Sequence, residues 1–143
     1  MVSNVDEVVL ADRLRLAIGR LARRLRQHSV GGLTPSQRSV LATLDRHGPM
    51  TMSRLAEIET ISAPSVTGII SRLAEKELVE RRPNPEDGRS AIVALTAAGR
   101  EMLEAGRRER TAYLLEHITR LSEEDRRIVA QAIEILDRLQ EEI

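Results

Sequence analysis

The feature that most constrains this chain is a β-hairpin signal in its middle. Two short runs typical of strands, Val79–Arg82 and Ala91–Leu95, flank a turn-forming segment that contains two prolines, an Asn, an Asp and a Gly. An extended run, turn chemistry and a second extended run together predict a hairpin. It carries three arginines, the last of them near its tip: Arg81, Arg82 and Arg89. Since a helix-forming segment directly precedes this hairpin, we expect a small sheet placed among helices.

Helical patterns surround the hairpin. Apolar residues recur at helical spacing, and each run begins with a residue suited to cap a helix. The clearest start is Thr34-Pro35-Ser36-Gln37, which combines a Thr N-cap, Pro at the first helical position and Gln at the third. The expected order is α-α-α-α-β-β-α-α, with helices that begin near Val5, Thr34, Thr51, Ser62, Thr96 and Ser122.

Composition excludes several classes of protein. A chain of 143 residues is long enough for one domain with its own core. It has no cysteine, which excludes disulfides, thiolate metal sites and thiol-based peroxide sensing. Its one aromatic ring among Phe, Trp and Tyr, Tyr113, argues against stacking on single-stranded bases. With no long apolar run and no secretory signal pattern, we expect no membrane contact and a cytoplasmic location.

Catalytic and metal-binding patterns are missing from the sequence as well. The three histidines have no metal-type spacing to each other or to carboxylates, and no Gly-rich phosphate loop or nucleophile elbow occurs. We therefore expect no enzyme activity, no cofactor and no metal site.

The segment Ser62–Lys76 carries the strongest functional signal. Its apolar residues at positions 66, 69, 70 and 73 define a buried helical stripe. The opposite face has small or hydroxyl-bearing residues and one arginine, with no carboxylate before Glu75. Because the net charge of the chain is zero, the argument for nucleic acid rests on this placement: an acid-free face can approach the phosphate-walled major groove closely. The residues on or beside this face are Pro64, Ser65, Thr67, Gly68, Ser71 and Arg72.

A short helix, a helix with such a face and an arginine-tipped hairpin form the layout of a winged helix-turn-helix. The expected fold is therefore mainly α with a small β-hairpin wing, and the expected partner is double-stranded DNA. Two other interpretations stay open. In the first, the acid-free face is an ordinary polar helix surface. In the second, the winged helix serves only as a protein-interaction module and does not read DNA directly.

These residues resemble the MarR family of bacterial transcriptional regulators. The resemblance covers about Leu33 to Arg100, and its most specific part is Asp87-Gly88-Arg89 followed by Leu95-Thr96-Ala97-Ala98-Gly99. It implies a winged helix-turn-helix region at 33–96 and a helical dimerisation region at 1–30 and 97–143. It also implies a homodimeric, sequence-specific regulator, expected to be a repressor on a pseudo-palindromic operator, with the helix Ser62–Lys76 in the major groove and the wing in the minor groove.

The resemblance also implies roles for single residues. Arg89 looks like the wing arginine that enters the minor groove, where narrow A·T-rich DNA concentrates negative potential. Asp87 looks like its partner at the wing tip; the alternative is that Asp87 forms the turn, and the two roles are compatible. The start of the helix after Thr51 is expected to meet phosphate. The full set of expected DNA contacts is Arg38, Thr51, Ser53, Arg54, Ser62, Pro64, Ser65, Thr67, Gly68, Ser71, Arg72, Arg81, Asp87 and Arg89.

Two positions depart from the family pattern. Gly68 stands where a long basic or polar residue is common, and it can make no side-chain base contact. Glu77 stands where Gly usually ends the helix. A left-handed residue with a side chain costs roughly 1 kcal/mol, so either Glu77 bears that strain or the helix ends differently.

The terminal helices have more apolar surface than a small winged helix needs. A two-fold dimer would bury it, and an intramolecular three-helix bundle is the alternative. The residues concerned are Val8, Leu10, Leu14, Ile128, Ile133, Leu136, Leu139 and Ile143.

The resemblance also leaves room for a small-molecule effector. Its polar candidates are Arg15, His28, His47 and Tyr113, although residues of these types are more often ordinary surface or interface residues.

Overall fold

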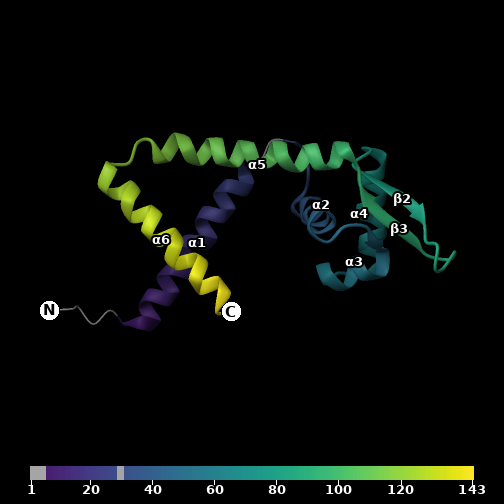
Figure 1. Ribbon diagram of the computed structural model, residues 1–143, viewed down its shortest axis with the longest axis horizontal. Coiled ribbons are helices and arrows are strands. Elements are labelled where there is room, and N and C mark those ends of the chain that lie inside the picture. The colour runs from purple at the N-terminus through teal and green to yellow at the C-terminus, as the bar shows by residue number, and fades with distance from the viewer. Residues whose placement is uncertain (1–5, 29–30) are drawn as a thin grey trace. The chain divides into compact units, whose positions relative to one another are not determined.

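The computed structural model describes residues 6–28 and 31–143 (Figure 1). Contacts within the chain cluster into two units: Met1–His28 with Arg110–Ile143, here the terminal-helix unit, and Ser29–Glu109, here the winged-helix unit. Helix α5 contributes to both. The elements are α1 (Glu7–Gln27), α2 (Pro35–His47), β1 (Met50–Thr51), α3 (Met52–Glu59), α4 (Ala63–Glu75), β2 (Val79–Pro83), β3 (Ala91–Leu95), α5 (Ala97–Ile118) and α6 (Glu123–Glu141).

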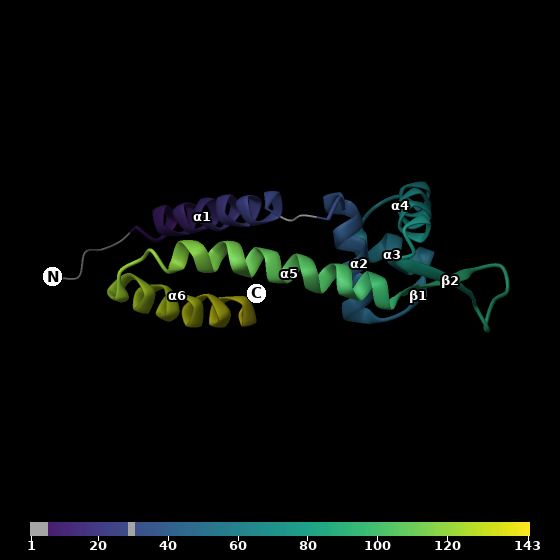
Figure 2. The same cartoon turned by 90° about the horizontal axis from the view of Figure 1, so that it is seen from above.

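The expected hairpin is present and gains a third strand. β2 and β3 pair antiparallel from Val79 opposite Leu95 to Pro83 opposite Ala91. β1 pairs with the other edge of β3, which gives the sheet order β1-β3-β2. Strand β1 was not expected from the sequence, because a run of two residues is too short to show any alternation. In both ribbon views the loop between β2 and β3 projects away from the helices of its unit (Figures 1 and 2).

The helix starts predicted at Thr34, Thr51, Ser62 and Thr96 are confirmed at the level of single hydrogen bonds, whereas the start expected near Val5 lies outside the described residues. Thr34 and Gln37 form a complete capping box at the start of α2. The hydroxyl oxygens of Thr51 and Ser62 accept from the backbone N–H groups three residues on, and Thr96 does the same for Gly99 at the start of α5. Each bond satisfies a donor that the first turn of a helix leaves unpaired. Local sequence therefore sets where these helices begin.

One apolar core holds the winged-helix unit together. The stripe predicted on α4 is real: Val66, Ile70 and Leu73 are fully buried, and Ile69 packs at the edge. Side chains from the other helices and the sheet complete the core, among them Val40, Leu41, Leu44, Leu55, Val79, Val93 and Leu103. Burial of this stripe fixes the rotation of α4 and turns its opposite face outward.

Helix α4 ends with a strained residue. Lys76 is its C-cap, and Glu77 adopts the left-handed conformation at φ 60°. The N–H of Leu78 donates to the carbonyl of Leu73, the closing bond of a Schellman-type end. Of the two alternatives left by the sequence, Glu77 bears the strain. Thr60, at φ 56° after α3, takes the same conformation, which the sequence analysis did not anticipate.

The terminal-helix unit has almost no interior of its own. Neither α1 nor α6 has a single buried residue among those described. Figure 2 shows that α1 and α6 lie apart. Of the eight apolar residues singled out from the sequence, Leu14 and Leu136 are half-buried. The other six are exposed: Val8, Leu10, Ile128, Ile133, Leu139 and Ile143.

Candidate nucleic-acid interface

The outward face of α4 has the composition expected from the sequence. Its residues from Pro64 to Arg72 that lie opposite the buried stripe are exposed, apart from Ser71, which is half-buried. Gly68 points into open space, since an added Cβ would meet no atom within 4 Å. The face therefore offers a close approach, with small groups at its centre and Arg72 toward its C-terminal end.

The hydroxyl groups on this helix already have partners. Ser62 and Ser65 join their Oγ atoms at 2.8 Å. Thr67 donates its hydroxyl proton to the carbonyl of Ala63 at 3.0 Å, one turn earlier. Ser71 accepts a hydrogen bond of 2.9 Å from the Arg81 guanidinium on β2. Each hydroxyl thus has a limited set of donor or acceptor positions left for a ligand.

Local hydrogen bonds shape the loop at the tip of the wing. The carboxylate of Asp87 accepts from the backbone N–H of Arg89 at 3.0 Å. This is the turn-forming role, because the bond runs to backbone and not to the guanidinium. Asn84 donates to the hydroxyl of Ser90 at 2.8 Å and accepts from the N–H of Glu86. Asn84 is one of the turn residues expected from the sequence, whereas its hydrogen bond to Ser90 was not expected.

Arg89 is exposed at the tip. Arg82 lies beside its neighbour Glu80, and the two side chains form an ion pair. The wing therefore presents Arg89 exposed at its tip, while Arg81 bonds to Ser71 and Arg82 pairs with Glu80.

The remaining expected contacts lie on α2 and α3. The Thr51 hydroxyl oxygen caps α3 by accepting from the N–H of Arg54, so a ligand would contact the hydroxyl proton or the second lone pair of that oxygen. Ser53 is exposed, and Arg54 is exposed while paired with Glu57 at 3.0 Å. Arg38 on α2 is half-buried.

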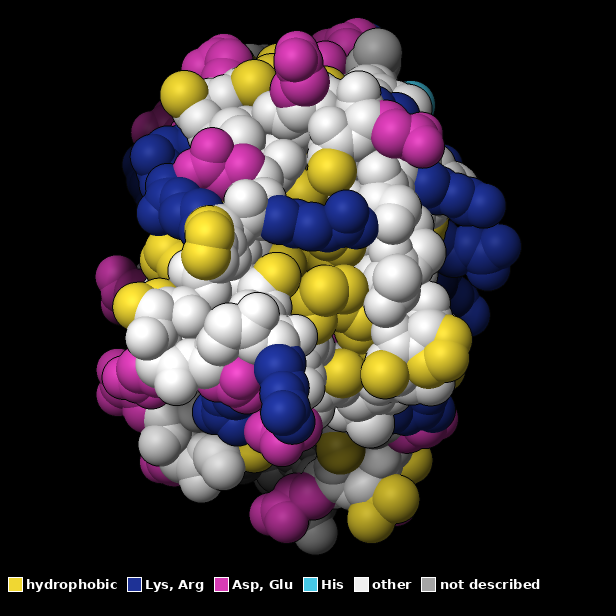
Figure 3. All heavy atoms as spheres, turned by 90° about the vertical axis from the view of Figure 1, so that its right-hand side faces the viewer, with side chains coloured by type: hydrophobic (Ala, Val, Ile, Leu, Met, Phe, Trp, Pro, Cys, Tyr) yellow, Lys and Arg dark blue, Asp and Glu magenta, His cyan; other side chains and the backbone are white. Residues whose placement is uncertain are grey.

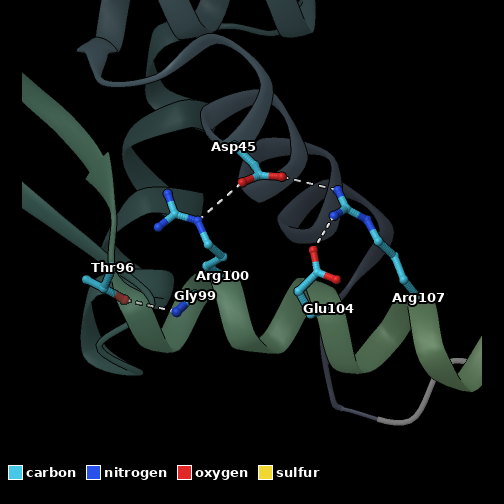
Figure 4. A network of polar contacts seen from close by, with 6 residues as sticks. All are labelled: Asp45, Thr96, Gly99, Arg100, Glu104 and Arg107. Atoms are coloured by element: carbon cyan, nitrogen blue, oxygen red, sulfur yellow. Dashed lines mark hydrogen bonds and ion pairs between the residues drawn. The ribbon is translucent and has the colours of Figure 1, made fainter.

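An ion-pair cluster, absent from the sequence analysis, fixes α5 within this unit (Figure 4). Asp45 on α2 meets Arg100 at 3.5 Å and Arg107 at 3.2 Å, both on α5. Arg107 also pairs with Glu104 at 2.5 Å. The hydrogen bond that Arg107 donates to the Asp45 carboxylate is the main cause that raises the pKa of the Arg107 guanidinium. The cluster joins segments far apart in the sequence.

The surface of the winged-helix unit is not uniformly basic. Seen from the side that carries the sheet, basic, acidic and uncharged side chains are interspersed (Figure 3). This agrees with a net charge of zero. Recognition of a polyanion must therefore depend on where single arginines stand, and not on overall attraction.

Two of the effector candidates meet in the terminal-helix unit. The rings of His28 and Tyr113 stack with centroids 3.9 Å apart. His117 adds a third ring, 4.5 Å from Tyr113. The contact between Tyr113 and His117 could have been predicted from the sequence, because residues four positions apart on a helix are neighbours on its surface.

The other two effector candidates stand elsewhere. Arg15 pairs with Asp12 at 2.5 Å, thirteen residues before His28 and so roughly 20 Å away along α1. His47 is exposed at the end of α2 in the winged-helix unit. The structure thus joins His28 with Tyr113 but not with Arg15.

The described residues form neither a metal-binding cluster nor a membrane-spanning helix. In that part of the chain, no group of three or more His, Cys, Asp or Glu residues is placed to hold a metal ion. None of the helices seen there is both long and apolar enough to cross a membrane.

Known proteins resemble this chain over nearly its whole length. A transcriptional regulator of the HTH type from Mycobacterium leprae is 38% identical over 134 residues, which is 93% of this chain and 94% of the relative. A crystal structure of a putative transcriptional regulator from Pseudomonas aeruginosa has a TM-score of 0.81 and 30% identity, covering 97% of this chain and 99% of that one.

A third match is to a mutant of MepR from S. aureus bound to an oligodeoxyribonucleotide. It has a TM-score of 0.72 at 22% identity and covers 91% of this chain and 97% of that one, a likeness of fold. The MarR family model matches residues 33–91, from the start of α2 to the wing. The relatives are transcriptional regulators and not enzymes. Together with the winged-helix fold and the outward face of α4, these matches show that the chain belongs to the MarR family of DNA-binding transcriptional regulators.

Proposed function

We propose that this regulator acts as a homodimer that binds a pseudo-palindromic DNA operator and represses transcription from it. The observation that carries the proposal is the exposed face of α4, which has no carboxylate between Pro64 and Arg72 and stands beside an arginine-tipped wing. On this reading, α4 enters the major groove and the wing enters the adjacent minor groove.

The shape of α4 supports insertion into the major groove. A groove about 12 Å wide admits one helix. Gly68 faces outward with no atom near its missing side chain, so backbone and bases can come close together. Ser65 and Thr67 are exposed on either side of it, and Arg72 is exposed one turn further on. Short hydroxyls and a single long cation then share the recognition of base edges.

The wing supports a minor-groove contact. The turn around Asp87 is fixed by hydrogen bonds within the loop, which holds the exposed Arg89 at the tip of the hairpin. An arginine offered from an ordered loop loses less conformational freedom on binding than one from a flexible loop. A narrow A·T-rich groove favours such a cation.

The terminal-helix unit supports dimerisation. Fourteen large apolar side chains of the described residues are more than a third exposed, and all of them lie between positions 8 and 21 or between 115 and 143. A monomer with this much apolar surface in one unit is unusual. A second copy related by a two-fold axis would cover it and would also supply the second recognition helix that a pseudo-palindrome needs.

Repression is the simplest outcome of such binding. Two recognition helices on half-sites one helical turn apart cover a promoter segment on one side of the duplex, and polymerase cannot occupy the same DNA. A small-molecule effector would act by favouring a dimer geometry that fits the operator less well. The stacked rings of His28 and Tyr113 offer one place where an aromatic ligand could bind.

The test combines assembly and binding. Sedimentation equilibrium at micromolar concentration should give a dimer. Selection from a random duplex pool should yield an inverted repeat, and fluorescence anisotropy should show two chains per selected duplex with weaker binding to a scrambled one. In transcription assays in vitro, the selected site placed over a promoter should reduce transcript when protein is added. A monomer bound to a single half-site would contradict the dimer, and equal affinity for all duplexes would favour a protein-interaction module.

A further inference from the structure

A side chain from the wing reaches the recognition helix. Arg81 on β2 donates from Nη2 to the Oγ of Ser71 on α4, at 2.9 Å. The two residues lie ten positions apart and belong to different elements, so the bond depends on how β2 packs against α4. It brings a positive charge to the edge of the helix face that the proposed function places in the major groove.

The register of the sheet explains why this arginine is the one that turns toward α4. Arg81 stands opposite Val93, which is fully buried, and Arg82 stands opposite Ile92. Successive strand residues point to opposite faces of a sheet, so Arg81, although exposed, lies on the same face as Val79 and Val93, and Arg82 lies on the other. Arg82 is engaged with Glu80 instead. The two neighbouring arginines therefore have separate roles.

The bond changes what Ser71 can offer to DNA. A serine hydroxyl has one proton to donate and two lone pairs that accept. The guanidinium occupies one lone pair and, as a charged donor, polarises the O–H bond so that its proton is donated more strongly. The nearby positive charge also repels base amino groups. Ser71 is thus suited to donate to an acceptor on a base edge.

Thr67, one turn earlier on the same side of α4, has the opposite polarity. Its proton is used on the carbonyl of Ala63, so its oxygen has only lone pairs left for a ligand. The hydroxyls of Ser71 and Thr67 look equivalent in the sequence. Their protein partners leave Ser71 to act as a donor toward a ligand and Thr67 to act as an acceptor.

We propose that Arg81 is a positioning residue for specificity: it sets Ser71 as a hydrogen-bond donor that selects guanine at one position in each half-site. Guanine is the base whose major-groove edge offers two acceptors, N7 and O6, and no donor. The inference rests on the proposed function, since it requires α4 to lie in the major groove.

The experiment measures base preference directly. Full-length wild type, Arg81→Ala, Ser71→Ala and the double variant are each used in selections from one random duplex pool. Anisotropy titrations then follow on selected duplexes with each of the four base pairs at the position in question. We expect wild type to prefer guanine there by about tenfold over cytosine. We expect both single variants to lose that preference to the same extent, and the double variant to lose no more.

Two controls separate this role from a general one. Arg82→Ala removes the neighbouring arginine on the opposite face of β2 and should leave the selected sequence unchanged. The base selected by Thr67 should also be the same in Arg81→Ala. Circular dichroism and thermal unfolding confirm that each variant is folded.

Other results would overturn the inference. If Arg81→Ala weakens binding to every duplex equally, lowers the salt slope by about one and keeps the guanine preference, Arg81 contacts only phosphate. If Arg81→Ala loses the preference while Ser71→Ala keeps it, Arg81 reads the base itself. If wild type selects no duplex at all, the proposed function has failed, and this outcome is distinct from the other two.

Discussion

The carbonyl oxygen of Leu78 lies so close to Gly99 that a Cβ atom built on that glycine would stand 2.1 Å from it. The contact joins the start of β2 to the first turn of α5, at the point where the N–H of Thr96 donates to the same carbonyl. Backbone meets backbone here, so neither side can move away by rotating a side chain. The junction between sheet and helix therefore requires glycine.

Gly99→Ala should destabilise the protein strongly. Relief of the clash requires a shift of α5 against β2, and overpacking of this kind costs at least about 1–3 kcal/mol. The measurement is the urea midpoint of unfolding. The matched control is Gly68→Ala, where a Cβ meets nothing within 4 Å and helix propensity predicts a gain of about 0.5–1 kcal/mol. Equal effects of the two variants would contradict the close approach.

Glu77→Gly should stabilise the protein by up to about 1 kcal/mol. The variant removes the steric cost of a left-handed residue that has a Cβ, partly offset by the greater freedom of glycine in the unfolded chain. Glu77→Ala is the control, because it removes the carboxylate but keeps the Cβ. Should alanine stabilise as much as glycine, the charge and not the conformation at φ 60° is the source of the effect.

Asp45→Asn should destabilise the winged-helix unit by about 1 kcal/mol at low salt, and by less at 1 M salt. The substitution removes the negative charge that Arg100 and Arg107 share. Since both arginines are about half exposed or more, solvent screens the loss. Asp12→Asn, which alters a fully surface pair with Arg15, should change the unfolding midpoint little. A loss that is independent of salt would indicate a packing role for Asp45.

Arg89→Ala should weaken DNA binding by on the order of 1–3 kcal/mol if the arginine contacts the minor groove. The loss should be greatest on operators with A·T-rich flanks, where groove narrowing sets the potential. Anisotropy titrations on duplexes with A·T and G·C flanks measure this difference. The same loss on both would mean that the wing meets only phosphate.

Gly68→Arg should raise overall affinity and lower discrimination. The new side chain can reach phosphate or a guanine edge from the outward face of α4, and each added phosphate contact steepens the salt dependence by about one unit of slope. Salt titrations of wild type and variant on selected and scrambled duplexes provide the measurement. If neither slope nor affinity changes on either duplex, position 68 does not face DNA.

Features set by neighbouring residues were predictable from the sequence. The caps at Thr34, Thr51 and Ser62 were found because a capping residue acts on an N–H group only a few positions away. The hairpin was found for the same reason, since turn residues and flanking strands are adjacent. Even the strain at Glu77 was visible as one of two alternatives. These elements depend on little beyond their own segment.

Features that join distant segments were not predictable. Strand β1 exists because Met50 and Thr51 find partners on β3, and two residues carry no period of their own. Nothing in the local sequence distinguishes Asp45 from other surface acids, because its partners Arg100 and Arg107 lie on α5. The bond from Arg81 to Ser71 likewise requires both the register of the sheet and the packing of β2 on α4. Sequence identified both residues as candidates but could not pair them.

The exposed apolar side chains of α1 and α6 have a consequence for how this regulator responds to its own abundance. On the proposed assembly, two chains must meet before either can hold both half-sites. At concentrations below the dimer dissociation constant, operator occupancy then rises with the square of the chain concentration. A modest change in synthesis or degradation of the chain would therefore produce a larger relative change in gene expression. The terminal helices would make operator occupancy depend steeply on the concentration of the protein, in addition to their structural role.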